Sequence, residues 1–276
     1  ASSLGSHVII LLMGAFMLSK ALEKSNVHSR FAFYMVSLTG SQSARRLVLG
    51  FMLTAALLSM WISNTATTLM LLPIALAVLK RVNDARLSAA ILLGIAYSAS
   101  LGGVGTPIGT PPNIIFMSVY SQSQGQEVSF LDWMAFGLPI VLIAIPLMAL
   151  WLTRGLGKLD NLQLPAAGRW DSGEKRVLYV FAIVALAWIF RPYWTAWFGL
   201  ESVGDSTIAL AGVVAMFLTP TGKQAGEKLL DWQTANDIPW GMLLLFAGGI
   251  CIAKAFDASG LSAAMGTWLG GLSNLP

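Results

Sequence analysis

The chain has 276 residues, of which 56% are hydrophobic and 11% charged, with a net charge of +4 and a mean hydropathy of +0.71. Soluble domains carry about 25% charged residues, so this composition excludes an ordinary soluble domain and indicates a membrane protein. The basic residues lie in short loops between apolar runs, which argues against a nucleic-acid partner. The single cysteine, Cys251, excludes an internal disulfide, and we expect it to be a small buried apolar residue.

Long apolar runs recur along the whole chain. A helix that crosses a bilayer needs about 20 mostly apolar residues. The runs predict spanning helices over His7–Leu22, Arg86–Ala99, Trp133–Leu152, Val177–Phe190, Ser206–Leu218 and Trp240–Phe256, several of them short. Trp133, Trp151, Trp188, Trp194, Trp197 and Trp240 lie near the proposed ends, where tryptophans contact the membrane interface. We therefore expect an all-α polytopic membrane protein in contact with the lipid bilayer.

The apolar run from Val48 to Leu79 is too long for one crossing and is interrupted by polar residues from Ser63 to Thr68. Basic residues flank the run on both sides, and cytoplasmic loops are enriched in such residues. They are Arg45 and Arg46 before the run, and Lys80, Arg81 and Arg86 after it. Both ends are thus predicted on the cytoplasmic side, which makes 47–80 a re-entrant hairpin.

Loop charges also orient the remaining spans. The first span is followed by Lys20 and Lys24 and so ends inside, whereas 120–130 and 199–205 contain acidic residues and no Lys or Arg and are predicted outside. Arg191 and Lys254 lie near predicted outer ends and weaken this assignment slightly.

A second irregular segment, Ser98–Asn113, is dense in glycine and proline and cannot continue a regular helix. It predicts a broken helix over 86–119. Unpaired backbone inside a membrane is tolerated only where it is buried or lines a cavity. Free carbonyls and hydroxyls at such breaks suit Na⁺, and the N-terminal ends of half-helices suit a carboxylate. Asn64 and Thr65 are expected to begin the second half-helix of the hairpin.

Two stretches, Leu11–Val27 and Leu245–Leu261, resemble each other at a constant offset of 234 residues, pairing Lys20 with Lys254. The loop charges give the two copies opposite directions, so we expect an inverted-topology repeat of the kind found in secondary transporters. The counterpart of Ser63 would fall beyond Pro276. We therefore expect a fragment that lacks a leading span and stops before its second hairpin.

Other functional classes lack their signatures in this sequence. The chain contains no His-Glu-X-X-His, Gly-X-Ser-X-Gly or P-loop pattern, so the sequence does not support an enzyme. Between Val48 and Val119 the only acidic residue is Asp84, which argues against a proton relay. A related antiporter, a carrier of sulfate or arsenite, and a channel or non-transporting membrane scaffold remain as alternatives.

Two motifs carry a resemblance to a known family. Ser63-Asn64-Thr65, preceded by Ser59, and the segment Gly109-Thr110-Pro111-Pro112-Asn113 closely resemble the divalent anion:sodium symporter family. The likeness extends from about Leu11 to near Leu261. It implies Na⁺-coupled uptake of small divalent anions, foremost C4-dicarboxylates such as succinate, by an elevator mechanism. It also implies a homodimer in the bacterial inner membrane.

The same resemblance implies the binding residues. Sodium would be held by Ser59, Ser63 and Asn64 and by the backbone carbonyl of Gly109, and no transition metal is expected. The substrate carboxylate would contact Ser63, Asn64, Thr65 and Thr110. Three regions follow: 1–43 with a scaffold helix and an interfacial helix; 44–157 as the transport region, with the hairpin 47–80, the broken helix 86–119 and a helix over 131–153; and 158–276 with scaffold helices and the start of the second repeat.

Overall fold

The computed structural model describes residues 5–39, 43–80, 82, 84–157, 170–200, 202–224 and 226–272. Within these residues the named secondary-structure elements are all helices, with no strand and an isolated bridge between Pro220 and Lys228, which confirms the all-α prediction. The helices are α1 (His7–Ser25), α2 (Val27–Thr39), α3 (Ala44–Ser59), α4 (Asn64–Leu79), α5 (Ala85–Gly102), the 3₁₀ turn η1 (Gly103–Gly105), α6 (Pro111–Gln124), α7 (Phe130–Leu152), α8 (Ser172–Ile189), α9 (Arg191–Phe198), α10 (Asp205–Leu218), α11 (Trp232–Asn236), α12 (Trp240–Ala258) and α13 (Leu261–Leu272). Arg81 and residues 158–169 of the third predicted region lie outside the described residues.

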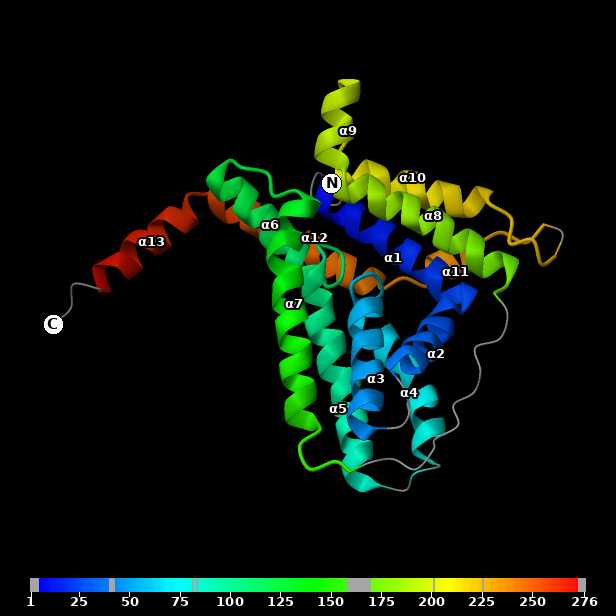
Figure 1. The fold of residues 1–276 in the computed structure, drawn as a ribbon. Helices are drawn as coiled ribbons and strands as arrows, with labels where there is room; N and C mark the ends of the chain where they lie inside the picture. Colours follow the sequence, from blue (N-terminus) through cyan, green and yellow to red (C-terminus); the bar gives the residue numbers. More distant parts are fainter. Residues whose placement is uncertain are drawn as a thin grey trace.

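The helices pack in two groups (Figure 1). One group contains α3, α4, α5 and α7, which run side by side, with α5 in contact with the other three. The other contains α1, α8 and α10, which lie across one end of the first group. Helix α2 packs on α3 and α4 and follows directly after α1, so it connects the two groups.

Glycines allow close helix packing in both groups. A Cβ atom on Gly14 of α1 would lie 2.7 Å from the Cβ of Ala209 of α10. A Cβ atom on Gly102 of α5 would lie 2.5 Å from the Cα of Ala56 of α3. Lipid offers no hydrophobic drive for helix association, so membrane helices depend on such close contacts between small residues.

In the part of the chain that the structure describes, three helical units are long and apolar enough to cross a membrane: α5 with η1 (Ala85–Gly105), α7 and α12. Helices α8 and α9 together make a fourth, although they are bent by 76° between Ile189 and Arg191. Helices α1 and α10, where spans were also predicted, do not combine the length and apolar composition needed to cross a membrane. Helix α10, with 14 residues, is about 21 Å long, shorter than the roughly 30 Å bilayer core.

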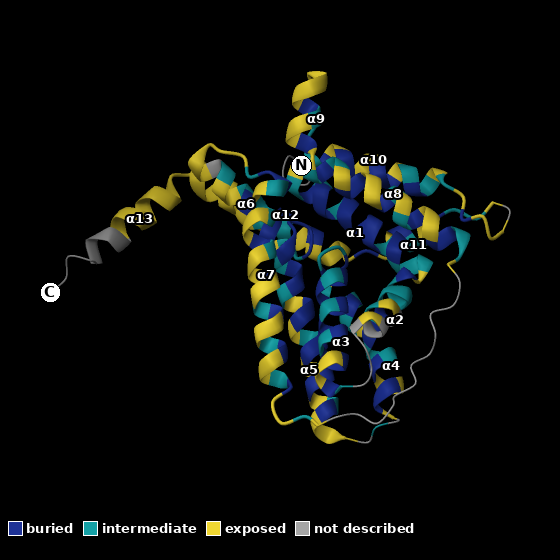
Figure 2. Cartoon of the chain, viewed as in Figure 1, coloured by how far each residue is buried: buried dark blue, intermediate teal, exposed yellow. Residues whose placement is uncertain are grey.

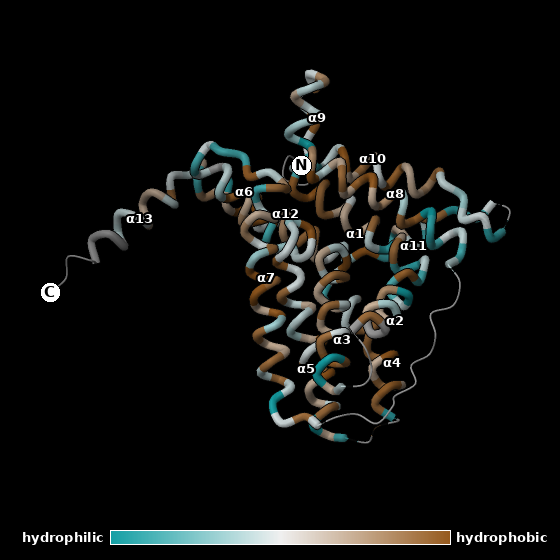
Figure 3. Tube along the Cα trace, in the orientation of Figure 1, coloured by the Kyte–Doolittle hydropathy of each residue, from teal (hydrophilic) through white to brown (hydrophobic). Residues whose placement is uncertain are grey.

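The outer face of α7 has the character of a lipid-facing surface. Phe136, Ile143 and Leu150 are each at least 60% exposed, and Figures 2 and 3 show α7 as both exposed and hydrophobic along its length. A contiguous apolar surface of this kind is rare on monomeric soluble proteins. Figure 2 also shows α13 exposed from Leu261 to Trp268.

Two sequence-based expectations are wrong. Trp188, expected at the membrane interface, is fully buried and stacks on Phe130 of α7, with ring centroids 5.4 Å apart. Its indole N–H donates to the carbonyl of Asp205, so the polar edge of the ring is satisfied inside the protein. Cys251, expected to be buried, is exposed on α12.

Contacts between helices agree with the sides assigned from loop charges. Lys24, predicted inside, forms a 2.6 Å ion pair with Asp231, and Arg30 forms a 2.9 Å ion pair with Glu174; all four flank predicted inner ends. On the predicted outer side, the ring Nδ1 of His7 lies 3.3 Å from the hydroxyl of Ser206.

Candidate functional site

The tip of the α3–α4 hairpin contains the Ser-Asn-Thr motif. Ser63 precedes α4 as its N-cap, and its hydroxyl accepts a hydrogen bond of 3.2 Å from the amide of Ala66. Asn64 and Thr65 are the first residues of α4, which confirms their predicted position. Backbone N–H groups in a first turn have no acceptor within their own helix, so this end of α4 presents donors and the positive end of a helix dipole. Ser63 and Thr65 are exposed, and Asn64 is half-buried.

Three oxygen atoms meet beneath this tip. The hydroxyl of Ser59, which is fully buried, lies 2.5 Å from the side-chain oxygen of Asn64 and 2.6 Å from the carbonyl oxygen of Ala99. A hydroxyl donates only one hydrogen bond. The second contact is satisfied either by an Asn64 amide turned to donate from its nitrogen or by a cation that the oxygens move apart to coordinate. The Ala99 carbonyl has no sequence signature, which is why the motifs did not reveal it.

No carboxylate of the described hairpin or broken helix lies at this cluster. Asp84, the only acidic residue from Val48 to Val119, caps the opposite end of α5 by accepting from the amides of Arg86 and Leu87. The cluster is therefore neutral and rich in partial negative charge. Such a donor set suits a weakly charged hard cation.

The glycine-proline segment packs against the same cluster. Helix α5 ends at Gly102, η1 covers Gly103–Gly105, and α6 begins at Pro111, so the segment interrupts the helix as predicted. A Cβ atom on Gly103 would lie 2.8 Å from the Asn64 side-chain oxygen and 3.3 Å from the carbonyl oxygen of Gly109. Gly103 thus lies between Asn64 and Gly109, and a side chain there would displace the Asn64 amide. The structure brings Ser59, Asn64 and Gly109 into one neighbourhood.

Two residues not assigned from the sequence hold this segment in place. The Thr106 hydroxyl donates to the Met60 carbonyl at the hairpin tip and accepts from the amide of Gly109 at 3.1 Å. The Asn113 side-chain nitrogen donates to the carbonyls of Gly103 at 2.8 Å and Thr106 at 2.9 Å. Thr106 is fully buried and Asn113 nearly so.

Thr110 occupies the N-cap position of α6 but makes no side-chain capping hydrogen bond, so its hydroxyl is available to a ligand. The first two residues of α6 are prolines, which have no N–H group to cap. The side chain of Thr110 is half-buried, between the buried Gly109 and the exposed end of the segment.

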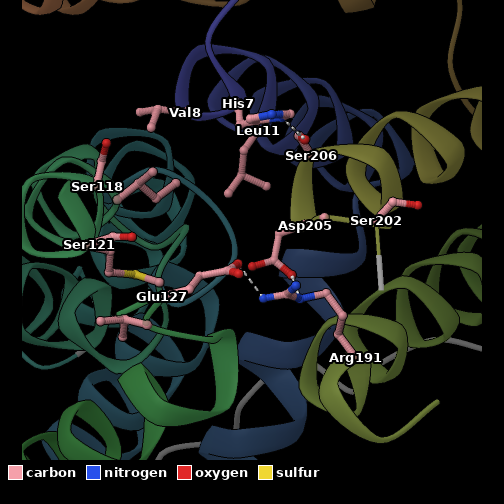
Figure 4. Close-up of a pocket in the computed structure, with 14 residues that line it drawn as sticks. His7, Val8, Leu11, Ser118, Ser121, Glu127, Arg191, Ser202, Asp205 and Ser206 are labelled. Carbon is pink, nitrogen blue, oxygen red and sulfur yellow. Dashed lines mark hydrogen bonds and ion pairs between the residues drawn. The ribbon is translucent and has the colours of Figure 1, made fainter. Parts of the chain in front are cut away.

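A separate pocket of about 390 Å³ opens on the predicted outer side, between α1, α6 and the start of α10 (Figure 4). Arg191 lines this pocket, with Nη2 2.7 Å from Glu127 and Nε 2.7 Å from Asp205. The pair of carboxylates explains why a basic residue is found at a predicted outer end, since its charge is neutralised there. The pocket contains none of the motif residues.

A helix hairpin and a broken helix that meet at a polar break, with apolar faces outside, are typical of secondary transporters of the membrane. All 276 residues match the family model described as citrate transporter (CitMHS). The chain belongs to this citrate transporter family. Family membership and the apolar helices make it a multi-pass integral protein of the plasma membrane and not an enzyme.

Curated relatives agree with the family and with the resemblance drawn from the two motifs. A sodium-dependent dicarboxylate transporter, SdcS of Staphylococcus saprophyticus, is 36% identical over 290 residues, which cover 96% of this chain and 55% of the relative. A protein of the same name from Staphylococcus aureus is 34% identical over 294 residues, which cover 98% of this chain and 56% of the relative. The chain thus spans about half the length of the curated relatives it matches.

Proposed function

We propose that this chain contributes to a Na⁺-coupled carrier of small divalent anions, with C4-dicarboxylates such as succinate as the main substrates. Sodium binds to the Ser59, Ser63 and Asn64 side chains and to the Gly109 carbonyl. The relatives named sodium-dependent dicarboxylate transporters support both the ion and the substrate class.

The observation that carries the proposal is the oxygen cluster of Ser59, Asn64 and Ala99. The Ser59 hydroxyl has one proton for two oxygens, which lie 2.5 and 2.6 Å away, so the cluster offers an oxygen to a cation unless the Asn64 amide is turned to present its nitrogen. A Na⁺ ion coordinated by these oxygens would separate them beyond hydrogen-bond distance, and unwound backbone and helix ends commonly bind Na⁺ in transporters. We add the Ala99 carbonyl to the proposed ligands on this ground.

The substrate carboxylate binds at the start of α4, where Ser63 and Thr65 are exposed and Asn64 is half-buried. The first-turn N–H groups and the helix dipole attract an anion there. Sodium bound directly beneath neutralises the carboxylate charge, which couples the two ligands. Thr110, whose hydroxyl is not used in capping, completes the contact from the broken helix.

The two helix groups support an elevator mechanism. The transport region, 44–157, contains the hairpin and the broken helix, and the scaffold is formed by α1, α8 and α10 within 1–43 and 158–276. Helix α2, which packs on the hairpin, is the interfacial connection. The similarity of Leu11–Val27 to Leu245–Leu261 supports an inverted repeat, and we propose that the carrier is a homodimer.

A second candidate is a carrier of sulfate or arsenite, or an antiporter, built on the same plan. The lack of any acidic residue except Asp84 from Val48 to Val119 favours sodium coupling over proton exchange. Counterflow with labelled succinate distinguishes the substrates. Competition by unlabelled succinate and not by sulfate supports the dicarboxylate, and the reverse order overturns it.

Site variants test the proposal in the transporter that contains this sequence, reconstituted in liposomes. Ser63→Ala and Asn64→Asp are expected to abolish Na⁺-dependent succinate uptake while the protein still inserts in the membrane. Ser88→Ala is the matched control, because its exposed hydroxyl bonds to the Asp84 carbonyl at the opposite end of α5. Unchanged uptake with unchanged Na⁺ dependence in both site variants refutes the site.

A further inference from the structure

We propose that Thr106 and Asn113 are positioning residues that set the sodium affinity of the site without contacting the ion. The inference deepens the proposed function and rests on the proposed Na⁺ site. Neither residue belongs to the ligand set proposed above.

Asn113 connects both ends of the turn that contains Thr106. Its amide nitrogen has two N–H groups, and each meets one carbonyl, that of Gly103 at 2.8 Å and that of Thr106 at 2.9 Å. The side chain is 6% exposed, so water does not replace these bonds easily. The amide therefore engages two of the loop carbonyls, neither of which is the proposed sodium ligand at Gly109.

Thr106 connects the turn to the hairpin. Its hydroxyl donates to the Met60 carbonyl, one residue beyond the end of α3, and at the same time accepts from the amide of Gly109. A single side chain thus joins the hairpin tip to the residue whose carbonyl is a proposed sodium ligand. Helices α3 and α6 hold the two ends of this connection.

The geometry leaves little slack between these residues and the ligands. A Cβ atom on Gly109 would lie 2.5 Å from the Gly103 carbonyl oxygen, so the two glycines are in direct contact. Any movement of Gly103 also changes the space beside the Asn64 side chain. Na⁺ has no covalent bond to hold its ligands, so its affinity depends on how well the protein fixes their separation.

The chain offers an isosteric test. Thr106→Val keeps the shape and removes the hydroxyl, Thr106→Ser keeps the hydroxyl, and Asn113→Asp keeps the shape but removes both N–H donors. Thr54→Val is the matched control, because Thr54 is also fully buried and its hydroxyl bonds only within its own helix, to the Gly50 carbonyl at 2.7 Å.

The readout is the initial rate of succinate uptake as a function of Na⁺ concentration, in liposomes containing the complete transporter. Losing a buried hydrogen bond is expected to raise the half-saturating Na⁺ concentration about tenfold in Thr106→Val and Asn113→Asp. The succinate KM at saturating Na⁺ is expected to stay within about twofold of the parent value, as is expected when only ion affinity changes. Thr106→Ser and Thr54→Val are expected to behave like the parent protein.

The outcomes separate this inference from the proposed function. A parent protein whose uptake is independent of Na⁺ overturns the proposed function itself. A Na⁺-dependent parent with an unchanged Na⁺ curve in Thr106→Val and Asn113→Asp overturns the positioning role alone. The positioning role is also overturned if the variants change the Na⁺ curve and the succinate KM equally and Thr54→Val shows the same changes. That result indicates a general loss of structure.

Discussion

Glu127 and Arg191 form an ion pair of 2.7 Å between the segment that precedes α7 and the first residue of α9. On the predicted outer side, it joins the segment before α7 of the first group to α9, which follows directly after α8 of the second group. The partners differ strongly in environment, since the side chain of Glu127 is 68% exposed and that of Arg191 only 10%. On its other side Arg191 contacts Asp205, which is 11% exposed, at 2.7 Å but not in hydrogen-bond geometry.

This asymmetry predicts unequal effects of mutation. Glu127→Gln removes an exposed partner and is expected to cost at most about 1 kcal/mol. Arg191→Met leaves the buried Asp205 without a positive charge and is expected to cost about 3–5 kcal/mol. Thermal unfolding in detergent micelles measures both. Equal unfolding midpoints for the two variants would contradict the claim that the buried Asp205 depends on the positive charge of Arg191.

Close packing at the hairpin predicts a graded response to added methyl groups. In Gly102→Ala the new Cβ meets backbone atoms of Ala56, which cannot move aside. We expect the free energy of unfolding to fall by about 1–3 kcal/mol or more. In Gly94→Ala the new Cβ meets the flexible side chain of Met52 at 2.9 Å, and the loss is expected to be smaller. The stabilities of the two variants are compared by the yield of monodisperse protein and by the unfolding midpoint. A Gly102→Ala variant as stable as the parent would mean that α3 and α5 do not approach this closely.

The re-entrant hairpin predicts that both of its ends are accessible from the cytoplasm. Cysteines introduced at Arg46 and Lys80, both exposed, are expected to react with a membrane-impermeant maleimide only from the cytoplasmic side. The exposed Cys251 is first replaced by serine. Labelling of the two positions from opposite sides would show that the run crosses the membrane once.

A pH effect is expected at the inner end of α1. The hydrogen bond from Lys24, and then the amide of Thr234, lower the pKa of Asp231 to about 2. A carboxylate with a lowered pKa stabilises the folded state above its ordinary pKa of 3.8, and this contribution is lost as the pH falls toward 2. The contribution of the Lys24–Asp231 ion pair to stability is therefore constant between pH 8 and about 5. Unfolding midpoints of the parent and Lys24→Met are expected to differ by the same amount across that range, and a difference that changes there would contradict this pKa.

Local signals made much of the fold predictable from the sequence. Ser63 before Asn64 is an N-cap pattern whose effect is confined to one helical turn, and α4 begins where the pattern predicts. The break at Ser98–Asn113 follows from the conformational limits of proline. The separate helix α9 was not predicted, although Arg191-Pro192 contains the signal, since proline is common in a first helical turn.

Long-range features could not be predicted in this way. Every residue has a carbonyl, so nothing in the sequence distinguishes that of Ala99 as a neighbour of Ser59. The roles of Thr106 and Asn113 depend on a fold that brings Met60 to the turn, 46 residues away along the chain. Trp188 was assigned to the interface from its position near a span end, whereas packing on Phe130 buries it.

The central claim is that Na⁺ binds at the Ser59 cluster and drives uptake. The most direct measurement is the initial rate of succinate uptake against Na⁺ concentration for Ser59→Ala and for the control Ser88→Ala, in liposomes containing the complete transporter. Removing a direct ligand is expected to raise the half-saturating Na⁺ concentration of Ser59→Ala at least about tenfold, with Ser88→Ala like the parent. A Ser59→Ala curve that coincides with that of the parent would contradict the claim.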